Sequence, residues 1–462
     1  MRPWSVALAV SLVASTAHAQ QAITDNNYTL EYFQGPVTSS GRVIGLGGAF
    51  TAVAEWCEGE YSNAASPAAR PRSSLRAFDF DLCLGFTAPG AFGGSDFENA
   101  GRNATSTRFS GSATFNLGLQ IIYRMFGATL VFDTFTLHVP NASTQTDIGI
   151  NRITTSVATS FLSGQLLLGV GLRAATFQAN TTDAAGVTTQ DFSQGGAGFQ
   201  VGAIIAPSKF PFRLGVTARG PISIEDVQGK AGGKILPSRV ELPWEVEVGG
   251  AVELAARTLN PVWVNPAIEE NVIRDRYRGL DKARLDEQRR ILASTAPDQR
   301  KRKRDELEKI EHDAKAKDTE AMDAELVVLA AKQAAERHRQ KRQTAILMGS
   351  LLVTGGVPNA VSITGFIDQQ RVPYGSRTSV SPRIGIEGEL VKNWLMVRAG
   401  SYLEPSLFDD VPYRVHFTGG LDLKLFVFNP FGIFGPDPWR IRLAADGAAR
   451  YFNTSFSLGK YY

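Results

Sequence analysis

The sequence predicts an all-β protein: a transmembrane antiparallel β-barrel of about 14 strands, with a separate N-terminal segment and a charged α-helical insert. Three observations lead to this prediction. Apolar and polar residues alternate with a period of two along most of the chain. Several alternating runs reach the roughly 9 to 11 residues that cross a bilayer at a tilt. Long polar connections also alternate with tight turns, as in barrels of the bacterial outer membrane.

The N-terminus has the features of a secretory signal peptide over residues 1–19. A positive residue, Arg2, precedes an apolar run, and Ala17-His18-Ala19 forms a small-residue cleavage site before Gln20. The chain is therefore expected to be exported. The apolar run at 345–353 is shorter than the roughly 20 residues that a membrane-spanning helix needs.

The alternation divides the barrel into two blocks, with strands 1–8 in residues 74–257 and strands 9–14 in residues 346–462. An even strand number returns both chain ends to the same side of the membrane. The individual strands are predicted near 75–87, 107–123, 128–139, 151–161, 165–177, 197–206, 211–219, 243–256, 360–370, 378–391, 394–404, 414–427, 438–446 and 449–462.

Residues 258–345 form an insert of different composition, in which about half of the stretch 268–343 is charged and glycine is scarce. Sparse apolar residues at spacings of three and four predict two helices, and Thr295-Ala296-Pro297-Asp298 separates them into a hairpin. Because the insert follows an even-numbered strand, it is expected in the periplasm. Its basic run at 300–304 is interpreted as a solvated helix face, with peptidoglycan or a periplasmic protein as a hypothetical partner.

Charged residues at alternating strand positions are predicted to face the lumen, where they pack against one another. The sequence contains no hydrolase motif, no phosphate-binding loop and no metal-ligand spacing among its five histidines, so neither an enzyme nor a cofactor is expected. A net charge of +3 gives no argument for a nucleic-acid partner. The predicted lumen charges are Glu245, Glu247, Arg383, Glu387 and Arg398.

Two cysteines, Cys57 and Cys83, occur in a chain bound for an oxidising compartment. Either a disulfide or two independent buried thiols is consistent with the sequence, because sequence alone does not supply the pairing geometry.

The stretch GRVIGLGGAFTAVAE, followed by YSNAASPA, resembles the N-terminal signature of the FadL/TodX family of outer-membrane transporters for hydrophobic compounds. A second stretch, VRAGSYLEPSLFDD at 397–410, is similar to a late strand and loop of that family. Ala64 stands where the family has proline, and a proline follows at 67. The matching motif residues are Gly41, Gly45, Gly47, Gly48, Phe50, Asn63 and Pro67.

The resemblance implies that residues 20–73 are a hatch folded inside the barrel lumen. It implies passive uptake of long-chain fatty acids or other hydrophobic small molecules through an apolar pocket above the hatch, which gates the channel. It also implies the outer membrane of a Gram-negative bacterium, with its lipid and lipopolysaccharide as surroundings. The barrel-assembly machinery is expected to read an aromatic final strand with Phe452, Phe456, Leu458 and Tyr462 on one face, interrupted by Lys460.

An alternative stays open at this point. Related barrels of secretion systems share a glycine-rich N-terminus, so the chain could instead be an outer-membrane scaffold that docks other proteins through its loops or its periplasmic insert.

Overall fold

The computed structural model describes most of the chain. The described residues are 21–32, 35–70, 74, 77–92, 96–101, 111–140, 144–229, 234–255, 259–262, 267–339, 343–372, 374–429 and 437–460. The predicted signal peptide, residues 1–19, and Tyr462 lie outside these ranges, as does the first hatch residue, Gln20.

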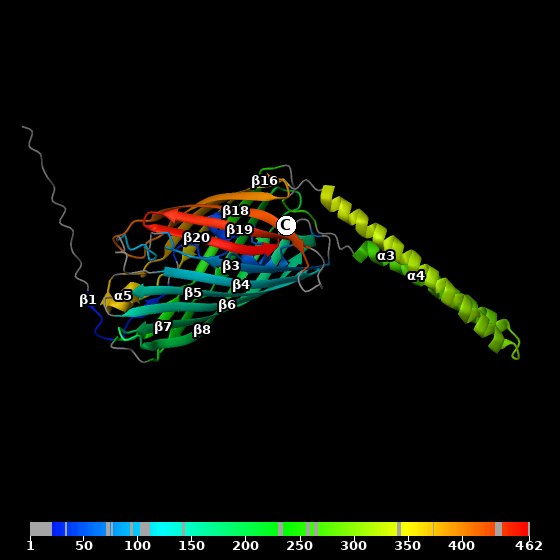
Figure 1. The fold of residues 1–462 in the computed structure, drawn as a ribbon, viewed down its shortest axis with the longest axis horizontal. Coiled ribbons are helices and arrows are strands. Elements are labelled where there is room, and N and C mark those ends of the chain that lie inside the picture. The colour runs from blue at the N-terminus through cyan, green and yellow to red at the C-terminus, as the bar shows by residue number, and fades with distance from the viewer. Residues whose placement is uncertain are drawn as a thin grey trace, which may run out of the picture.

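Fourteen strands close into one antiparallel barrel, which confirms the predicted fold class (Figure 1). Sequence neighbours pair around the wall, and the last strand, β20, pairs with the first, β3. The barrel strands are β3 (Phe78–Thr87), β4 (Gly111–Tyr123), β5 (Phe126–Pro140), β6 (Gln145–Phe161), β7 (Leu166–Thr182), β8 (Thr188–Ile205), β9 (Phe212–Arg219), β12 (Glu245–Glu253), β13 (Ala345–Thr354), β16 (Ser379–Val391), β17 (Leu395–Glu404), β18 (Arg414–Phe428), β19 (Asp437–Ala448) and β20 (Tyr451–Lys460).

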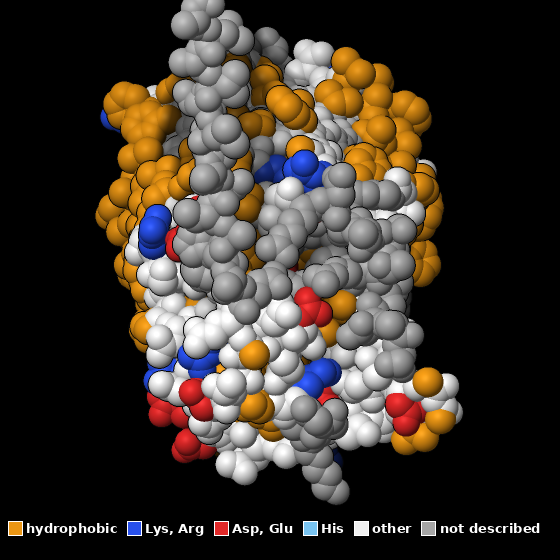
Figure 2. Space-filling view, turned by 90° about the vertical axis from the view of Figure 1, so that its left-hand side faces the viewer, with side chains coloured by type: hydrophobic (Ala, Val, Ile, Leu, Met, Phe, Trp, Pro, Cys, Tyr) orange, Lys and Arg blue, Asp and Glu red, His pale blue; other side chains and the backbone are white. Residues whose placement is uncertain are grey.

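The outer face of the wall is apolar and the inner face is polar. On β4, Leu117, Leu119 and Ile121 are 48%, 43% and 44% exposed, whereas Asn116 and Gln120 on the opposite face of the strand are buried. Seen from the loop end, hydrophobic side chains cover the flanks of the barrel (Figure 2). Side chains of this kind on the outside of a closed barrel are those that face lipid.

The predicted strand at 360–370 is wrong, and the ninth barrel strand is β13 instead. In β13 the outward Leu347 and Leu351 alternate with Ile346 and Met348, which are also apolar because they pack on the hatch inside the lumen. Because both faces of β13 are apolar, its sequence lacks the alternation of apolar and polar residues by which the other strands were predicted. Residues 360–371 fold at the loop end as β14 (Ala360–Val361), α5 (Ile363–Asp368) and β15 (Gln370–Arg371).

The N-terminal segment begins at the loop end and runs through the lumen to the opposite end. Its first part pairs with loop segments: β1 with β15, and β2 in the centre of a four-stranded sheet, between β11 and β14. At the far end Arg70 donates hydrogen bonds to the backbone oxygen of Arg124 in the β4–β5 turn. The elements are β1 (Gln21–Ala22), β2 (Thr29–Glu31), α1 (Gly41–Gly45), α2 (Trp56–Gly59) and the 3-10 helix η1 (Ser66–Ala68), with β10 (Ile222–Glu225) and β11 (Arg239–Leu242) completing the sheet.

The insert is an antiparallel helical hairpin of α3 (Ala267–Ser294) and α4 (Arg300–Arg339), broken where the sequence predicts. Ion pairs join the two helices, including Arg276 with Glu325 and Arg284 with Asp318. The hairpin projects from the barrel end that carries the short turns, opposite β1 and α5 (Figure 1). None of the described helices combines the length and apolar content that crossing a membrane requires.

Candidate functional site

The glycine-rich motif forms the first turn structure of the hatch. Helix α1 ends at Gly45, and the chain then reverses through Gly47 and Gly48, whose φ angles of 61° and 78° lie in the left-handed region that glycine adopts without strain. The Gly48 amide donates to the Val43 oxygen at 2.9 Å, which closes the turn. Phe50 follows, fully buried, with the Arg42 guanidinium 4.7 Å from its ring centre.

Glycines of the barrel wall form the seat on which the hatch backbone rests. A Cβ atom added at Gly385 would lie 2.6 Å from the Leu46 oxygen, and one at Gly215 would lie 2.7 Å from the Ala52 Cα. Three seat positions are directly opposed glycine pairs on neighbouring strands. These pairs are Gly385 with Gly400, Gly215 with Gly249, and Gly169 with Gly202. Any larger side chain at the seat would collide with the hatch.

Asn63 fastens the hatch to the seam between β8 and β9. Its side-chain amide nitrogen donates to the oxygens of Thr51, Ala203 and Val216 at 3.1, 3.1 and 3.3 Å, and Ala203 and Val216 are opposed residues on β8 and β9. Its oxygen accepts from the Ala65 amide at 2.9 Å. The whole side chain is buried, so one residue joins two segments of the hatch to two strands of the wall.

Pro67 and Ala64, the other two positions of the motif, bring the hatch backbone against the barrel wall. Pro67 is the second residue of the short helix η1, and its backbone lies against Gly127 of β5, while the Ala64 backbone lies against Gly169 of β7. An alanine at position 64 therefore keeps the close backbone contact.

A buried network of charges joins the hatch to the opposite wall. Arg42 donates to Glu387 at 2.7 and 2.9 Å and to Glu55 at 3.0 Å. Glu387 also pairs with Arg398 at 2.5 Å, and Arg398 pairs with Asp422. Because these groups are all nearly inaccessible to solvent, loss of one partner would leave an uncompensated buried charge.

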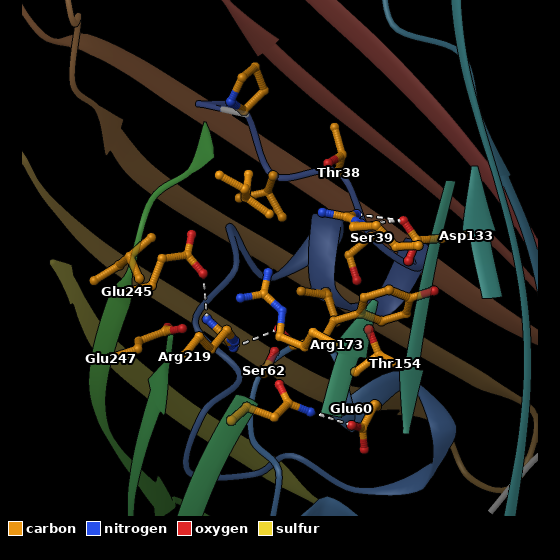
Figure 3. Close-up of a pocket in the computed structure, with 18 of the residues that line it drawn as sticks. Thr38, Ser39, Glu60, Ser62, Asp133, Thr154, Arg173, Arg219, Glu245 and Glu247 are labelled. Atoms are coloured by element: carbon orange, nitrogen blue, oxygen red, sulfur yellow. Dashed lines mark hydrogen bonds and ion pairs between the residues drawn. The ribbon is translucent and has the colours of Figure 1, made fainter. Parts of the chain in front are cut away.

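Between the hatch and the barrel wall lies a cavity of about 130 Å³ (Figure 3). The apolar pocket expected above the hatch is not what the described residues form there: the cavity is lined by four arginines and four carboxyl groups. The arginines are Arg152, Arg173, Arg219 and Arg383, and the acids are Glu60, Asp133, Glu245 and Glu247. Apolar side chains, among them Val37, Val43 and Leu352, share the lining with these charges.

The five predicted lumen charges all lie inside the barrel, but in two groups. Glu245, Glu247 and Arg383 line the cavity, where Arg383 lies 3.6 Å from Glu247. Glu387 and Arg398 belong to the buried network described above. Among the described residues no cluster of His, Cys, Asp and Glu is arranged to hold a metal ion.

An apolar cluster fills the loop end, beyond the cavity. The ring of Tyr32 contacts that of Phe177 with centres 4.8 Å apart, and Phe192 contacts Phe366 at 6.0 Å. Tyr28, Leu30 and Tyr32 come from the N-terminal segment, and the others come from the wall and loops; we call this group the mouth cluster. Its buried members also include Phe97, Phe135, Leu137, Ile148, Ile150, Ile222, Val240 and Ile363.

The two cysteines are paired in the structure. A disulfide joins Cys57 in the hatch to Cys83 on β3, with Cα atoms 6.2 Å apart.

Lys460 interrupts the aromatic face of β20. Its side chain donates a hydrogen bond to the Phe80 backbone oxygen at 2.9 Å and lies 3.7 Å from the centre of the Phe80 ring. The lysine therefore bridges the last and first strands.

Sequence reasoning missed the glycine seat and the mouth cluster. Glycines at inward strand positions, flanked by outward apolar residues, were the available signal for the seat. The mouth cluster has no such signal, because Tyr28 and Tyr32 meet Phe177 and Phe366 only after the barrel has closed.

Comparison with known proteins defines the fold. No protein-family model matches the chain, and no curated protein matches its sequence. A FadL homologue from Pseudomonas aeruginosa superposes with a TM-score of 0.51 at 10% identity, covering 94% of this chain and 99% of that one.

Two other solved structures match with lower scores. The CymD monoaromatic hydrocarbon channel gives a TM-score of 0.47 at 11% identity, covering 92% and 98% of the two chains. The Pseudomonas putida toluene transporter TodX gives 0.44 at 11% identity, covering 93% and 99%.

A closed 14-stranded barrel with an apolar outer surface, filled by its own N-terminal segment, is an architecture of the Gram-negative outer membrane. The chain thus has the FadL-type fold of an outer-membrane barrel.

Proposed function

We propose that the protein is an outer-membrane channel for passive uptake of hydrophobic small molecules, such as long-chain fatty acids or aromatic hydrocarbons. The observation that carries this proposal is the mouth cluster, which places a continuous group of aromatic and aliphatic side chains at the loop end of the barrel, above the charged cavity. An apolar ligand would bind by inserting between these side chains, so that contacts with the ligand replace contacts among the side chains.

The charged cavity under the mouth cluster disfavours passage of an apolar molecule straight through the lumen. An apolar molecule there would displace water from the charged side chains, and desolvation of charged groups costs free energy. A sideways exit between β8 and β9 avoids this cost. The ladder between these strands covers only Gln200–Ile205, whereas β8 stays paired with β7 from Thr188 onward. Since Asn63 bonds to both strands at this seam, movement of the hatch would accompany opening.

Measurements of ligand uptake by cells test the proposal. Cells with and without the protein are given radiolabelled oleate or toluene, and initial uptake is measured at equal protein expression. We expect faster uptake with the protein, and a smaller increase when Asn63→Ala alters the seam. Equal uptake in cells with and without the protein contradicts the channel proposal.

A second candidate function, docking of a periplasmic partner or peptidoglycan, is favoured by the helical hairpin. Helix α4 has 40 residues, corresponding to roughly 60 Å at the rise of an α-helix. Its apolar residues Ile310, Val327 and Val328 are 56%, 68% and 68% exposed. Crosslinking in intact cells from a photoreactive residue at Val328 would identify a periplasmic partner. Crosslinks to no protein and to no peptidoglycan fragment would contradict docking.

A further inference from the structure

The cavity between hatch and wall contains one arginine, Arg173, that forms no close ion pair among the described residues, although Glu245 attracts it from a longer distance. Arg152 pairs with Asp133 at 2.6 Å, Arg219 with Glu245 at 3.1 Å, and Arg383 faces Glu247 at 3.6 Å. Those pairs leave Arg173 on β7, which is only 8% exposed. Its Nη1 atom has no hydrogen-bond partner among the described residues. Figure 3 shows Arg173 in the middle of the lining residues.

Three more buried donors around the same cavity lack partners within the described part of the chain. They are the hydroxyl groups of Ser39 and Tyr61 in the hatch and the Nε atom of Arg383 on β16. Arginine has donors and no acceptor, and a hydroxyl group always offers one donor. Four unsatisfied donors outnumber the one unsatisfied acceptor of the described lining, the Oε2 atom of Glu60, so the cavity selects an occupant that accepts hydrogen bonds.

The arrangement of the charges points the same way. The lining contains four guanidinium groups and four carboxyl groups. Ser156 and Gln200 donate hydrogen bonds to the Glu60 carboxyl group, which forms no close ion pair with an arginine of the described part of the cavity. The Arg173 guanidinium group therefore has no carboxylate in direct contact within the described lining. A buried charge without a close partner is costly unless an opposite charge joins it.

We propose that this cavity is a binding site for a small oxyanion, of the size of acetate or phosphate, held by Arg173 together with Ser39, Tyr61 and Arg383. The volume of about 130 Å³ has room for several water molecules or one small organic anion. Because the donors come from the hatch and from two distant strands of the wall, the anion would fasten the hatch in its seat. This site goes beyond the proposed function, since it needs no apolar ligand.

Calorimetric titration of the full-length protein in neutral detergent tests the site, with sodium acetate and sodium phosphate as probes at constant ionic strength. We expect saturable binding of at least one probe, weakened at least tenfold in Arg173→Gln. The matched control is Arg302→Gln, which makes the same change on the exposed surface of the hairpin and should bind as the wild type does.

A second variant keeps the test decisive if Arg173→Gln does not fold. Tyr61→Phe removes one donor without changing charge, and we expect it to weaken binding about threefold to tenfold. Sodium dodecanoate tests whether the site takes a free anion or the carboxylate head of an amphiphile. A site for a free anion binds acetate or phosphate at least as tightly as it binds dodecanoate.

Three outcomes would overturn the proposal. These are no binding of either small probe to the wild type, unchanged binding in both cavity variants, and binding of dodecanoate alone. None of them depends on uptake of oleate or toluene, so failure of the anion site is distinguishable from failure of the channel proposal.

Discussion

The side-chain amide of Asn63 donates a hydrogen bond to the backbone oxygen of Ala203, 3.1 Å away, and so ties the hatch to a barrel strand at the β8–β9 seam. The adjacent wall residue, Gly202, allows this approach, because a Cβ there would lie 2.9 Å from the Ala64 nitrogen and would overlap the Asn63 side chain. Close backbone packing at Gly202 and the hydrogen bonds of Asn63 therefore hold the hatch at the same point of the wall.

Replacing Gly202 by valine should displace the hatch from its seat. The added side chain has no room beside Asn63 and Ala64, and overpacking of this kind costs about 1–3 kcal/mol. We expect the variant to raise the entry of small hydrophilic antibiotics into cells several-fold. Gly279→Val in the hairpin, where the added Cβ would meet nothing within 4 Å, is the control. Wild-type antibiotic entry in Gly202→Val would show that the seat tolerates a side chain.

Removing Arg42 should destabilise the hatch strongly. Arg42→Met leaves Glu55 and Glu387 buried with one cation fewer, and breaking a buried ion pair on one side costs about 3–5 kcal/mol. We expect the double variant Arg42→Met/Glu387→Leu to recover part of this loss. Urea unfolding in lipid vesicles measures the difference. Equal free energies of unfolding for wild type and Arg42→Met would contradict a stabilising role of the network.

The contact between Glu98 and helix α5 should weaken as pH rises. Glu98 accepts hydrogen bonds from Thr364 and from the Ile363 amide at 2.7 Å. Burial raises its pKa from 4.5 to about 7, against the effect of these hydrogen bonds. The folded state therefore holds the proton more tightly than the unfolded state does, so the contribution of Glu98 to stability is largest below pH 4.5 and is lost as pH rises through 7.

The size of this effect is about 3 kcal/mol, from the separation of the two pKa values. Hydrogen exchange of residues 363–368, followed by mass spectrometry at pH 5 and pH 8 with rates corrected for intrinsic pH dependence, measures it. We expect faster opening at pH 8, and Glu98→Gln should remove most of the difference. An equal pH dependence in Glu98→Gln would assign the effect to another group.

Deleting the hairpin should leave the barrel intact. The strands on either side are already paired: the Glu253 carboxylate accepts from Thr344 and from the Ala345 amide, both at 2.8 Å. A short Gly-Ser turn in place of residues 267–339 can therefore join the two strands, and it keeps Leu259 and Asn260, which accept hydrogen bonds from the buried Arg213. We expect heat-modifiable migration and hydrophobic uptake like those of the wild type. Failure of this variant to fold would mean that the hairpin contributes to barrel assembly.

The sequence predicted the parts of the fold that depend on local pattern. Outward apolar residues such as Leu117 and Leu119 alternate with polar ones, so the barrel and most of its strands were predictable, and the high charge of α3 and α4 marked the insert. Strand β13 was not predictable by alternation, because Ile346 and Met348 face an apolar hatch rather than water.

The site was predictable only in its hatch motif and in the choice of charges for the lumen. Which charges pair with which depends on strand register, as for Arg398 with Asp422 on the neighbouring strand. The polar cavity and the mouth cluster arise from segments more than a hundred residues apart. No local pattern in the sequence encodes such contacts.

The course of the N-terminal segment has a consequence for biogenesis. Strand β2 pairs with β11 and β14, whose residues lie about 200 and 330 positions later in the chain. These partners do not exist until most of the polypeptide has reached the membrane, and contacts of such sequence separation form slowly. The segment that is synthesised and exported first therefore finds its place last.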